Sequence, residues 1–432
     1  MRALLIALTL CLLCACPPVD PCNAPGERSV TITSSGLPDG VDGIIHVNGQ
    51  TVTNNGAVTL STGQLVVSGD AVGGPSEQLV RTAYVPAFTP ADECVAPDAG
   101  LPIAAAWSAV PTSAKLWTLN QNGAAQLVGL DTFTLDAGLE EHVTAAAAIA
   151  TDVGQFTFDE NGNVWAVQGT LASSALNFYP ASDFASSGAR TPSVKLGVSA
   201  LTGCIPGASA LAFDAHGDLW LASVCDNAVY KLSRDLLGAS GTINPLAKLT
   251  VPSPGGLAFD ATGRLFVASR DDGRVYRFDA AQLNADATEP AAKIGVRVST
   301  EPANTTIYTA GWLAFDSRGA LWFNDFGANV YAAIPATALN DTGSVDVQPS
   351  ASVLIGVSAL LENFAFDEQG GLWSAASSGK VFRLSPDQLT GVIDPGQPTT
   401  PERVIQSADL AYVNGVALYP APASLPLFHA LP

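Results

Sequence analysis

The stretch LAFDATGRLFVASRDDGRVYRFDAAQL, residues 257–283, decides the fold of this chain because the chain repeats it with small variations. Three of its segments alternate apolar and polar residues as short β-strands do, and two polar segments separate them. The first polar segment, 260–263, begins with an Asp that can accept backbone N–H bonds and ends with a Gly that allows positive φ. Such a unit cannot bury its apolar face alone, so its copies must pack together.

The repeat is easiest to count by the aromatic residue that follows the turn. This residue recurs every 46 to 56 residues, at Trp117, Trp165, Trp220, Phe266, Trp322 and Trp373. After its third strand, each module continues with a short helical turn, a loop and a fourth strand. Modules of four short strands with a period of about 50 residues are typical of propeller blades. The sequence therefore predicts an all-β protein with a six-bladed β-propeller.

Both ends of the repeat region are incomplete. The first module, 107–117, has Pro111 where the turn Asp should be, so its inner strand is weak. Residues 414–418, NGVAL, match the inner-strand pattern, but no full module follows them. We expect this terminal strand to complete the first blade and close the ring, which leaves no open sheet edge there. If 107–110 were a true inner strand instead, a seventh, partial blade would follow at the C-terminus.

The pattern Leu-Ala-Phe-Asp-x-x-Gly-x-Leu-Trp, followed by Val-Tyr and a Gln-Leu turn, resembles the NHL-repeat propellers of bacterial secreted proteins. More distantly, it is similar to streptogramin lyase and to gluconolactonase-like propellers. The resemblance implies the fold of residues 101–432. It implies little about activity, because the matching residues belong to the scaffold and many functions share this fold.

The N-terminus predicts export. An apolar run within 1–15 ends in LCAC at 13–16, which resembles the lipobox of bacterial lipoproteins. The resemblance implies a signal peptide at 1–15, cleavage before Cys16 and lipid attachment to that residue; an ordinary secretory signal is the alternative. Residues 16–28 would then be a Pro-rich tether. Because the Asp that retains enteric lipoproteins at the inner membrane is missing after Cys16, we expect a lipid-anchored envelope protein at the outer membrane.

Residues 29–100 predict a separate unit. Short alternating segments separated by Gly, Asn, Asp and Pro turns indicate a small β-sandwich. The pattern GLPDGV at 36–41 followed by short strands resembles immunoglobulin-like or PEGA-like spacer domains. The segment 97–102 reads as a linker to the propeller.

Charge and cysteines agree with export. The chain has a formal net charge of −20, which argues against nucleic acid as a partner because such binding needs clustered Lys and Arg. After Cys16 the chain contains four cysteines, an even number in a compartment that permits disulfides. We expect the pairs Cys22–Cys94 and Cys204–Cys225, each worth roughly 3–4 kcal/mol; free thiols or a metal site are the alternative.

Propellers commonly bind ligands on the rim that holds the loop before the inner strand and the loop after the second strand. These loops supply the candidate ligand residues Asp226, Arg270, Asp271, Trp312, Asn324, Asp325, Glu362, Asn363 and Asn414. Gluconolactonase-like enzymes hold a divalent metal at the axis, and that resemblance would assign this role to Glu362, Asn363, Asn324, Asp325 and Asn414.

No catalytic motif stands out. The Asp-x-x-Gly segments are too short for calcium loops and read as structural turns. Streptogramin lyase activity needs His, and residues 105–420 contain only His142 and His216. We therefore expect no catalytic residue, metal or cofactor, and a non-catalytic binding or scaffolding module for an envelope protein, glycan or small ligand. The alternative is a calcium-dependent lactonase, hydrolase or lyase with carboxylate and Asn ligands at the propeller axis.

Overall fold

The structure is a computed structural model of the chain. It describes residues 26–38, 41–61, 63–69, 72–73, 80–89, 94–95, 100–113, 115–120, 125–130, 141–142, 147–150, 153–159, 161–168, 175–184, 186–201, 208–298, 306–325, 328–356, 360–367, 369–392, 398–406 and 410–419. The chain divides into two compact units, Met1–Pro75 with Thr82–Val110, and Ser76–Arg81 with Pro111–Pro432. Among the described residues, no helix is long and apolar enough to cross a membrane.

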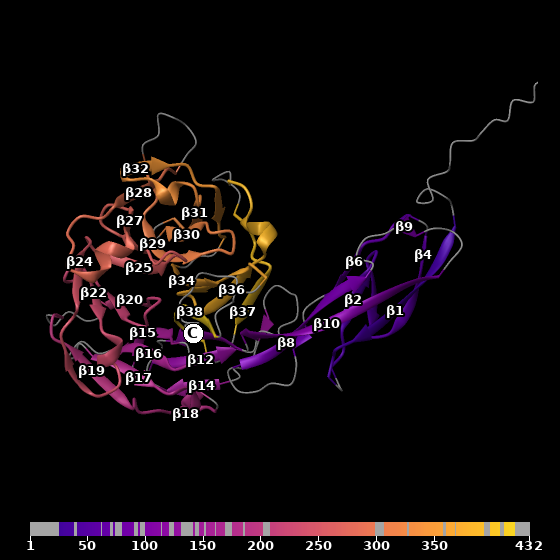
Figure 1. The fold of residues 1–432 in the computed structure, drawn as a ribbon, viewed down its shortest axis with the longest axis horizontal. Coiled ribbons are helices and arrows are strands. Elements are labelled where there is room, and N and C mark those ends of the chain that lie inside the picture. Colours follow the sequence, from indigo (N-terminus) through magenta and orange to yellow (C-terminus); the bar gives the residue numbers. More distant parts are fainter. Residues whose placement is uncertain are drawn as a thin grey trace, which may run out of the picture. The chain divides into compact units, whose positions relative to one another are not determined.

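The first unit is built from three sheets around one apolar core (Figure 1). The largest has the order β4 (Gly56–Ser61), β1 (Glu27–Ser35), β10 (Leu101–Ser113), β8 (Val80–Thr89) and β7 (Val72–Gly73). The second has the order β3 (Gln50–Thr53), β2 (Ile44–Val47) and β6 (Val67–Gly69), and the third pairs β5 (Gly63–Gln64) with β9 (Cys94–Val95). Ile32 of β1, Ile45 of β2 and Ile103 of β10 are all buried in the same core, because each strand turns its alternate apolar residues inward.

The segment around Trp107 corrects two sequence predictions. We predicted a linker at 97–102 and the first propeller module from 107, but β10 pairs with β1 in parallel from Leu101 to Ala106. Trp107 is buried in the core of the first unit. The reading of 107–110 as an inner strand, and with it the seventh blade, is therefore wrong. The sequence assigned 107–110 to the propeller because these residues precede Trp117, the first aromatic of the repeat, whereas pairing with a strand 71 positions earlier is a tertiary choice.

The described residues of the second unit form six sheets of four or five strands. Three of them have the orders β38 (Val413–Tyr419), β11 (Lys115–Asn120), β12 (Gln126–Leu130), β14 (Ala147–Ala150), β18 (Gly188–Ala189); β15 (Val153–Phe158), β16 (Val164–Gln168), β17 (Ala175–Tyr179), β19 (Val194–Val198), β23 (Gly241–Ile243); and β20 (Ala208–Phe213), β21 (Leu219–Ser223), β22 (Ala228–Leu232), β24 (Ala247–Thr250).

The other three sheets follow along the chain. Their orders are β25 (Pro254–Phe259), β26 (Leu265–Ser269), β27 (Val275–Phe278), β28 (Ala292–Val296), β32 (Gly343–Val347); β29 (Ala310–Phe315), β30 (Leu321–Asp325), β31 (Val330–Ile334), β33 (Ala351–Leu354); and β34 (Leu361–Phe366), β35 (Leu372–Ala376), β36 (Lys380–Leu384), β37 (Arg403–Gln406), β13 (Glu141–His142). Short 3-10 helices interrupt the modules at η3 (Ala181–Phe184), η4 (Arg234–Leu236), η5 (Ala280–Asn284), η6 (Ala338–Asn340) and η7 (Pro386–Leu389).

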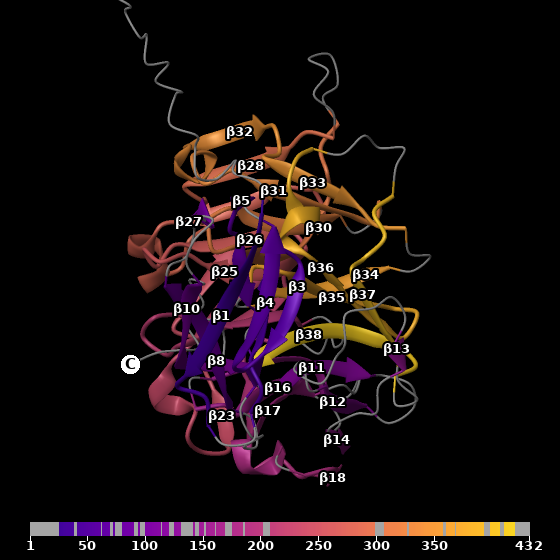
Figure 2. The same cartoon turned by 90° about the vertical axis from the view of Figure 1, so that its right-hand side faces the viewer.

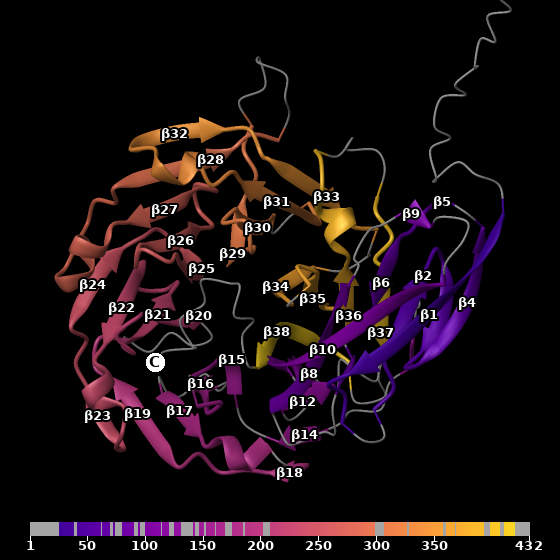
Figure 3. The same cartoon turned by 45° about the vertical axis from the view of Figure 1, so that its right-hand side comes forward.

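The six inner strands, β15, β20, β25, β29, β34 and β38, contact one another in that order, and β38 contacts β15 (Figure 3). The sheets therefore surround a common axis, as the propeller prediction requires. The strand that closes the ring comes from the end of the chain. β38 pairs antiparallel with β11, with Val416 opposite Thr118 and Leu418 opposite Leu116 (Figure 2). The predicted completion of the first blade by 414–418 is confirmed.

The outer edges of the sheets are covered in a way the sequence did not suggest. β18, β23, β32 and β13 each add to an outer strand in parallel. In the two four-stranded sheets, single parallel bridges do the same, Leu249 with Ala287 and Ser352 with Val392. In most cases the covering segment comes from the module that follows in sequence. These parallel segments use backbone groups that would otherwise form exposed edges, where chains aggregate.

The Asp-x-x-Gly segments are tight turns, as predicted. Asp214 accepts the backbone N–H of His216 at 2.8 Å and that of Asp218 at 3.1 Å. Gly217 has φ +80°, which a residue with a side chain adopts only with strain. Asp260, Asp316 and Asp367 accept the same two backbone bonds in their modules.

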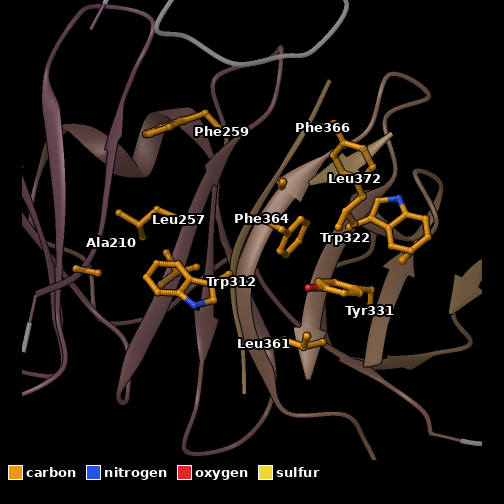
Figure 4. Close-up of a cluster of buried hydrophobic side chains, with 14 of the residues drawn as sticks. Ala210, Leu257, Phe259, Trp312, Trp322, Tyr331, Leu361, Phe364, Phe366 and Leu372 are labelled. Atoms are coloured by element: carbon orange, nitrogen blue, oxygen red, sulfur yellow. The ribbon is translucent and has the colours of Figure 1, made fainter. Parts of the chain in front are cut away.

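The aromatic residues after the turns pack between blades. Trp220 contacts Phe259 of the next module, with ring centroids 6.0 Å apart, and Trp322 contacts Phe366 at 6.1 Å. Figure 4 shows the second of these pairs, with Tyr331 and Phe364 beside it. Since each aromatic side chain buries a large apolar area, these contacts hold neighbouring blades together.

Candidate functional site

The predicted rim residues lie on the inner strands of the blades or at the C-terminal ends of the second strands. Trp312, Glu362, Asn363 and Asn414 belong to inner strands, and the others follow or end second strands. The structure brings three of them together as an axial cluster, Arg270, Trp312 and Glu362, from three neighbouring sheets.

Glu362 and Arg270 carry opposite charges at the centre of this cluster. The Glu362 side chain is only 8% exposed, and burial raises its pKa to about 7, although the positive charge of Arg270 opposes that shift. Burial lowers the pKa of Arg270, and the charge of Glu362 opposes it in turn. The Arg270 guanidinium lies 5.7 Å from the centroid of the Trp312 ring, within the range of a cation–π contact.

The Trp312 indole N–H completes the cluster. It lies close enough to the Glu362 carboxylate to lower its pKa, although the geometry is too poor for a regular hydrogen bond. Gly256 makes room for the backbone at Trp312: a Cβ on Gly256 would stand 2.6 Å from the Trp312 Cα. The inner strands can therefore approach closely only because β25 carries glycine there.

Asn324 positions the cluster and is not free to bind a ligand. Its Oδ1 accepts the Trp312 backbone N–H at 2.6 Å, and its Nδ2 donates to the Leu361 carbonyl at 2.8 Å. The side chain is fully buried and joins two neighbouring inner strands. Sequence placed Asn324 on the ligand rim, whereas the structure uses it as a bridge that fixes Trp312 and the residue preceding Glu362.

The acidic rim residues do not join the cluster. Asp325 accepts the Thr309 N–H at 2.9 Å and the Ala328 N–H at 3.1 Å, so both its oxygens order a loop. Asp226 accepts from the Ser223 hydroxyl at 2.6 Å, and Asp271 is exposed to solvent. The predicted acidic rim therefore supplies one carboxylate to the axis, that of Glu362.

Sequence reasoning missed Gln155 and Tyr412. Gln155 donates to the Asn414 Oδ1 at 2.8 Å across the junction of β15 and β38. Counted back from the turn, Gln155 occupies the same repeat position as Trp312 and Asn363, and aligning the modules would have found it. Tyr412 has a 40% exposed ring, and burial followed by the charge of Glu362 raises its pKa. It lies outside the repeat pattern, so no sequence signal marked it.

The axial residues do not fit a calcium site. Asn324 uses both ends of its amide within the protein, and both Asp325 oxygens accept backbone N–H groups. Calcium needs six to eight oxygen ligands, yet Glu362 offers one carboxylate with the Arg270 cation beside it. Within the described ranges, no three His, Cys, Asp or Glu side chains are grouped so that they could hold a metal ion.

The raised pKa of Glu362 predicts a pH-dependent stability. The folded state holds this proton more tightly than the unfolded chain, whose Glu has a pKa of 4.5. This stabilisation is therefore complete below pH 4.5 and is lost as the pH rises through about 7. We expect the free energy of unfolding to fall by roughly 2–3 kcal/mol between pH 5 and pH 8 for this reason. Urea unfolding at both pH values should show this loss in the wild type and not in Glu362→Gln; equal pH dependence in both would contradict it.

No protein-family model matches the chain, and no curated protein matches it in sequence. Similar solved structures include a streptogramin B lyase (12% identity, 72% of this chain and 95% of that chain, TM-score 0.42), the WD40 β-propeller domain of Doa1 (13%, 68% and 79%, 0.41) and a nidogen/laminin complex (10%, 72% and 99%, 0.47). These likenesses concern the fold alone. The predicted distant similarity to streptogramin lyase propellers is confirmed. The chain is an all-β protein that contains a β-propeller.

Proposed function

We propose that the chain is a non-catalytic binding module whose propeller axis takes a neutral, hydroxyl-rich ligand, of which a glycan is the main example. The observation that carries this proposal is that Glu362, Arg270 and Trp312 come together at the axis, with the exposed Tyr412 within reach of the Glu362 charge.

The charge of the cluster favours a neutral ligand. When Glu362 is ionised, it cancels the charge of Arg270, so the pair attracts neither cations nor anions strongly. The pair still offers a planar guanidinium donor and a carboxylate acceptor, which suit neighbouring hydroxyl groups. Around it, Gln155, Asn363 and Asn414 add amide groups that can donate and accept.

Tyr412 supplies the apolar part of such a site. An exposed aromatic ring close to buried polar groups is the arrangement in which one end of a ligand can stack while the other forms hydrogen bonds. The formal net charge of −20 argues against acidic polymers as ligands, because like charges repel.

The test is a glycan array probed with the full-length chain at pH 8. We expect binding to neutral glycans, weakened about tenfold in Tyr412→Ala, since a stacked ring contributes up to about 1.5 kcal/mol. Leu236→Ala, which removes an exposed apolar side chain from η4, is the matched control and should bind as the wild type does. Binding that survives both Tyr412→Ala and Arg270→Ala would rule out the axial site.

A hydrolase or lyase is the second candidate, and one observation favours it. A buried Glu with a pKa of about 7 is poised to give or take a proton at neutral pH. This version needs no calcium, which the axial residues do not fit. If the protein is an enzyme, Glu362→Gln abolishes turnover of a bound glycan but leaves the binding that depends on Tyr412. If Glu362→Gln and Tyr412→Ala both weaken binding and the wild type turns over no glycan, the module is non-catalytic.

The export features remain proposals. Lipid attachment at Cys16 would tether the module to the outer membrane. Disulfides between Cys22 and Cys94 and between Cys204 and Cys225 would stabilise its fold. Cys16, Cys22 and Cys204 lie outside the described residues. The intact mass of the protein purified from a bacterial envelope tests both ideas. We expect the mass of a chain that starts at Cys16 with acyl groups and takes up four thiol-blocking groups only after reduction; an unmodified N-terminus or immediate blocking would refute them.

A further inference from the structure

A cavity of about 380 Å³ lies between the sheet of β15–β19 and the sheet of β20–β24, on the side of the Asp-x-x-Gly turns. Its walls are mainly apolar, and a single basic side chain stands at its edge. The residues concerned are Trp165, Phe178, Val194, Phe213, Leu237 and Arg234. A cavity of this size suits a small molecule.

The module that lines this cavity differs from two other modules in the residue that faces its Trp across the strands. In the next module, Trp220 faces Lys231 across the strands, and Lys231 pairs with the turn residue Asp214 at 3.4 Å. Trp373 likewise faces Arg383, which pairs with its own turn Asp at 2.6 Å. Trp165 instead faces Phe178, with ring centroids 4.9 Å apart. An apolar ring thus stands where these two modules carry a basic side chain that reaches the turn, while Trp117 and Trp322 face Gly129 and Ala333.

The indole of Trp165 also differs from its equivalents, because it does not donate to the turn Asp. Trp220, Trp322 and Trp373 each donate their indole N–H to the turn Asp, at 2.9 to 3.0 Å. Asp159, the equivalent Asp beside the cavity, accepts from the Asn163 amide at 2.9 Å instead. The Trp165 indole N–H donates neither to Asp159 nor to any other group among the described residues. Trp165 lines the cavity.

The polar groups left over in the cavity are donors. Arg234 donates from Nη1 to the His216 carbonyl at 2.8 Å, and its other guanidinium nitrogens donate to no described residue. Among the described lining residues the one carboxylate, that of Asp159, already accepts two backbone N–H bonds and the Asn163 amide. A ligand that satisfies this cavity therefore has to bring an acceptor, and Arg234 favours one with a negative charge.

We propose that this cavity binds a small aromatic carboxylate, whose ring lies among Trp165, Phe178 and Phe213 and whose carboxylate meets Arg234. The site is separate from the axial cluster, because its residues come from other strands and from the turns at the opposite ends of those strands. The proposal for this cavity can therefore be tested independently of the proposed glycan binding.

The test is ligand-detected NMR with the full-length chain and three probes that share a phenyl ring: 3-phenylpropionate, its neutral amide, and phenyltrimethylammonium. We expect the carboxylate to bind, and the amide and the cation to bind at least about tenfold more weakly, as the loss of a charge-assisted bond implies. Arg234→Gln should weaken carboxylate binding to the level of the amide.

Two further variants make the result specific. Phe178→Lys restores the basic residue that blade β20–β24 carries at this position, so it should fold and abolish binding. Arg318→Gln removes an exposed Arg from the turn of another module and should leave binding unchanged. Equal binding of all three probes, binding that survives Phe178→Lys with an unchanged melting temperature, or no binding of the carboxylate at about 10 mM would each overturn the proposal.

Discussion

Replacing Asp367 with Ala should lower the free energy of unfolding by about 3–5 kcal/mol, because it breaks a buried ion pair. The Asp367 carboxylate accepts from Arg383 at 2.6 Å and from the Trp373 indole at 2.9 Å. It also accepts the backbone N–H groups of Gln369 and Gly371. All these donors are left without this acceptor in the variant. Arg383 keeps only its contacts with Glu402 and Gln369, so its buried charge is less well compensated.

The measurement is urea unfolding of Asp367→Ala beside Asp271→Ala. Asp271 is exposed and serves as the matched control, so its removal should change the free energy of unfolding by less than about 0.5 kcal/mol. A double variant, Asp367→Ala with Arg383→Met, should recover part of the loss because it removes the buried cation that has lost this partner. A loss below about 1 kcal/mol in the single variant would show that the turn Asp does not hold the blade together.

A chain that ends at Gln406 should fail to fold into a stable propeller. It lacks β38, whose side chains Val413, Val416 and Leu418 are buried in the first blade. Burial of three such side chains contributes roughly 5–9 kcal/mol, which is as large as the whole stability of a typical domain. The truncation also leaves β11 with an unpaired edge, which favours aggregation.

The measurement is thermal unfolding with dye binding to exposed apolar surface. The control is a chain that ends at Tyr419 and keeps β38; it should unfold in one cooperative transition. The shorter chain should bind the dye without heating and elute as aggregates. A cooperative transition within a few degrees of the control's would mean that ring closure contributes little, and the role given to β38 would be wrong.

The axial site could be predicted only in part. Sequence placed Arg270, Trp312 and Glu362 on one rim because repeat positions fix which ends of the strands meet. It could not tell that Asn324 and Asp325 are engaged within the protein, because those bonds run to backbone groups of a neighbouring strand and loop. Tyr412 was missed since it precedes the closing strand, where the repeat is incomplete.

The sequence by itself determined the propeller, because period, turn residues and strand alternation are local properties that each module states again. It also determined the closing strand, since an inner-strand pattern without a following module has to pair with the incomplete first blade. Only the tertiary structure decided that Trp107 belongs to the first unit and that Glu362, Arg270 and Trp312 come together. The same is true of the cavity beside Trp165 and Phe178. These features depend on which side chains meet across strands and blades, and a one-dimensional pattern does not contain those distances.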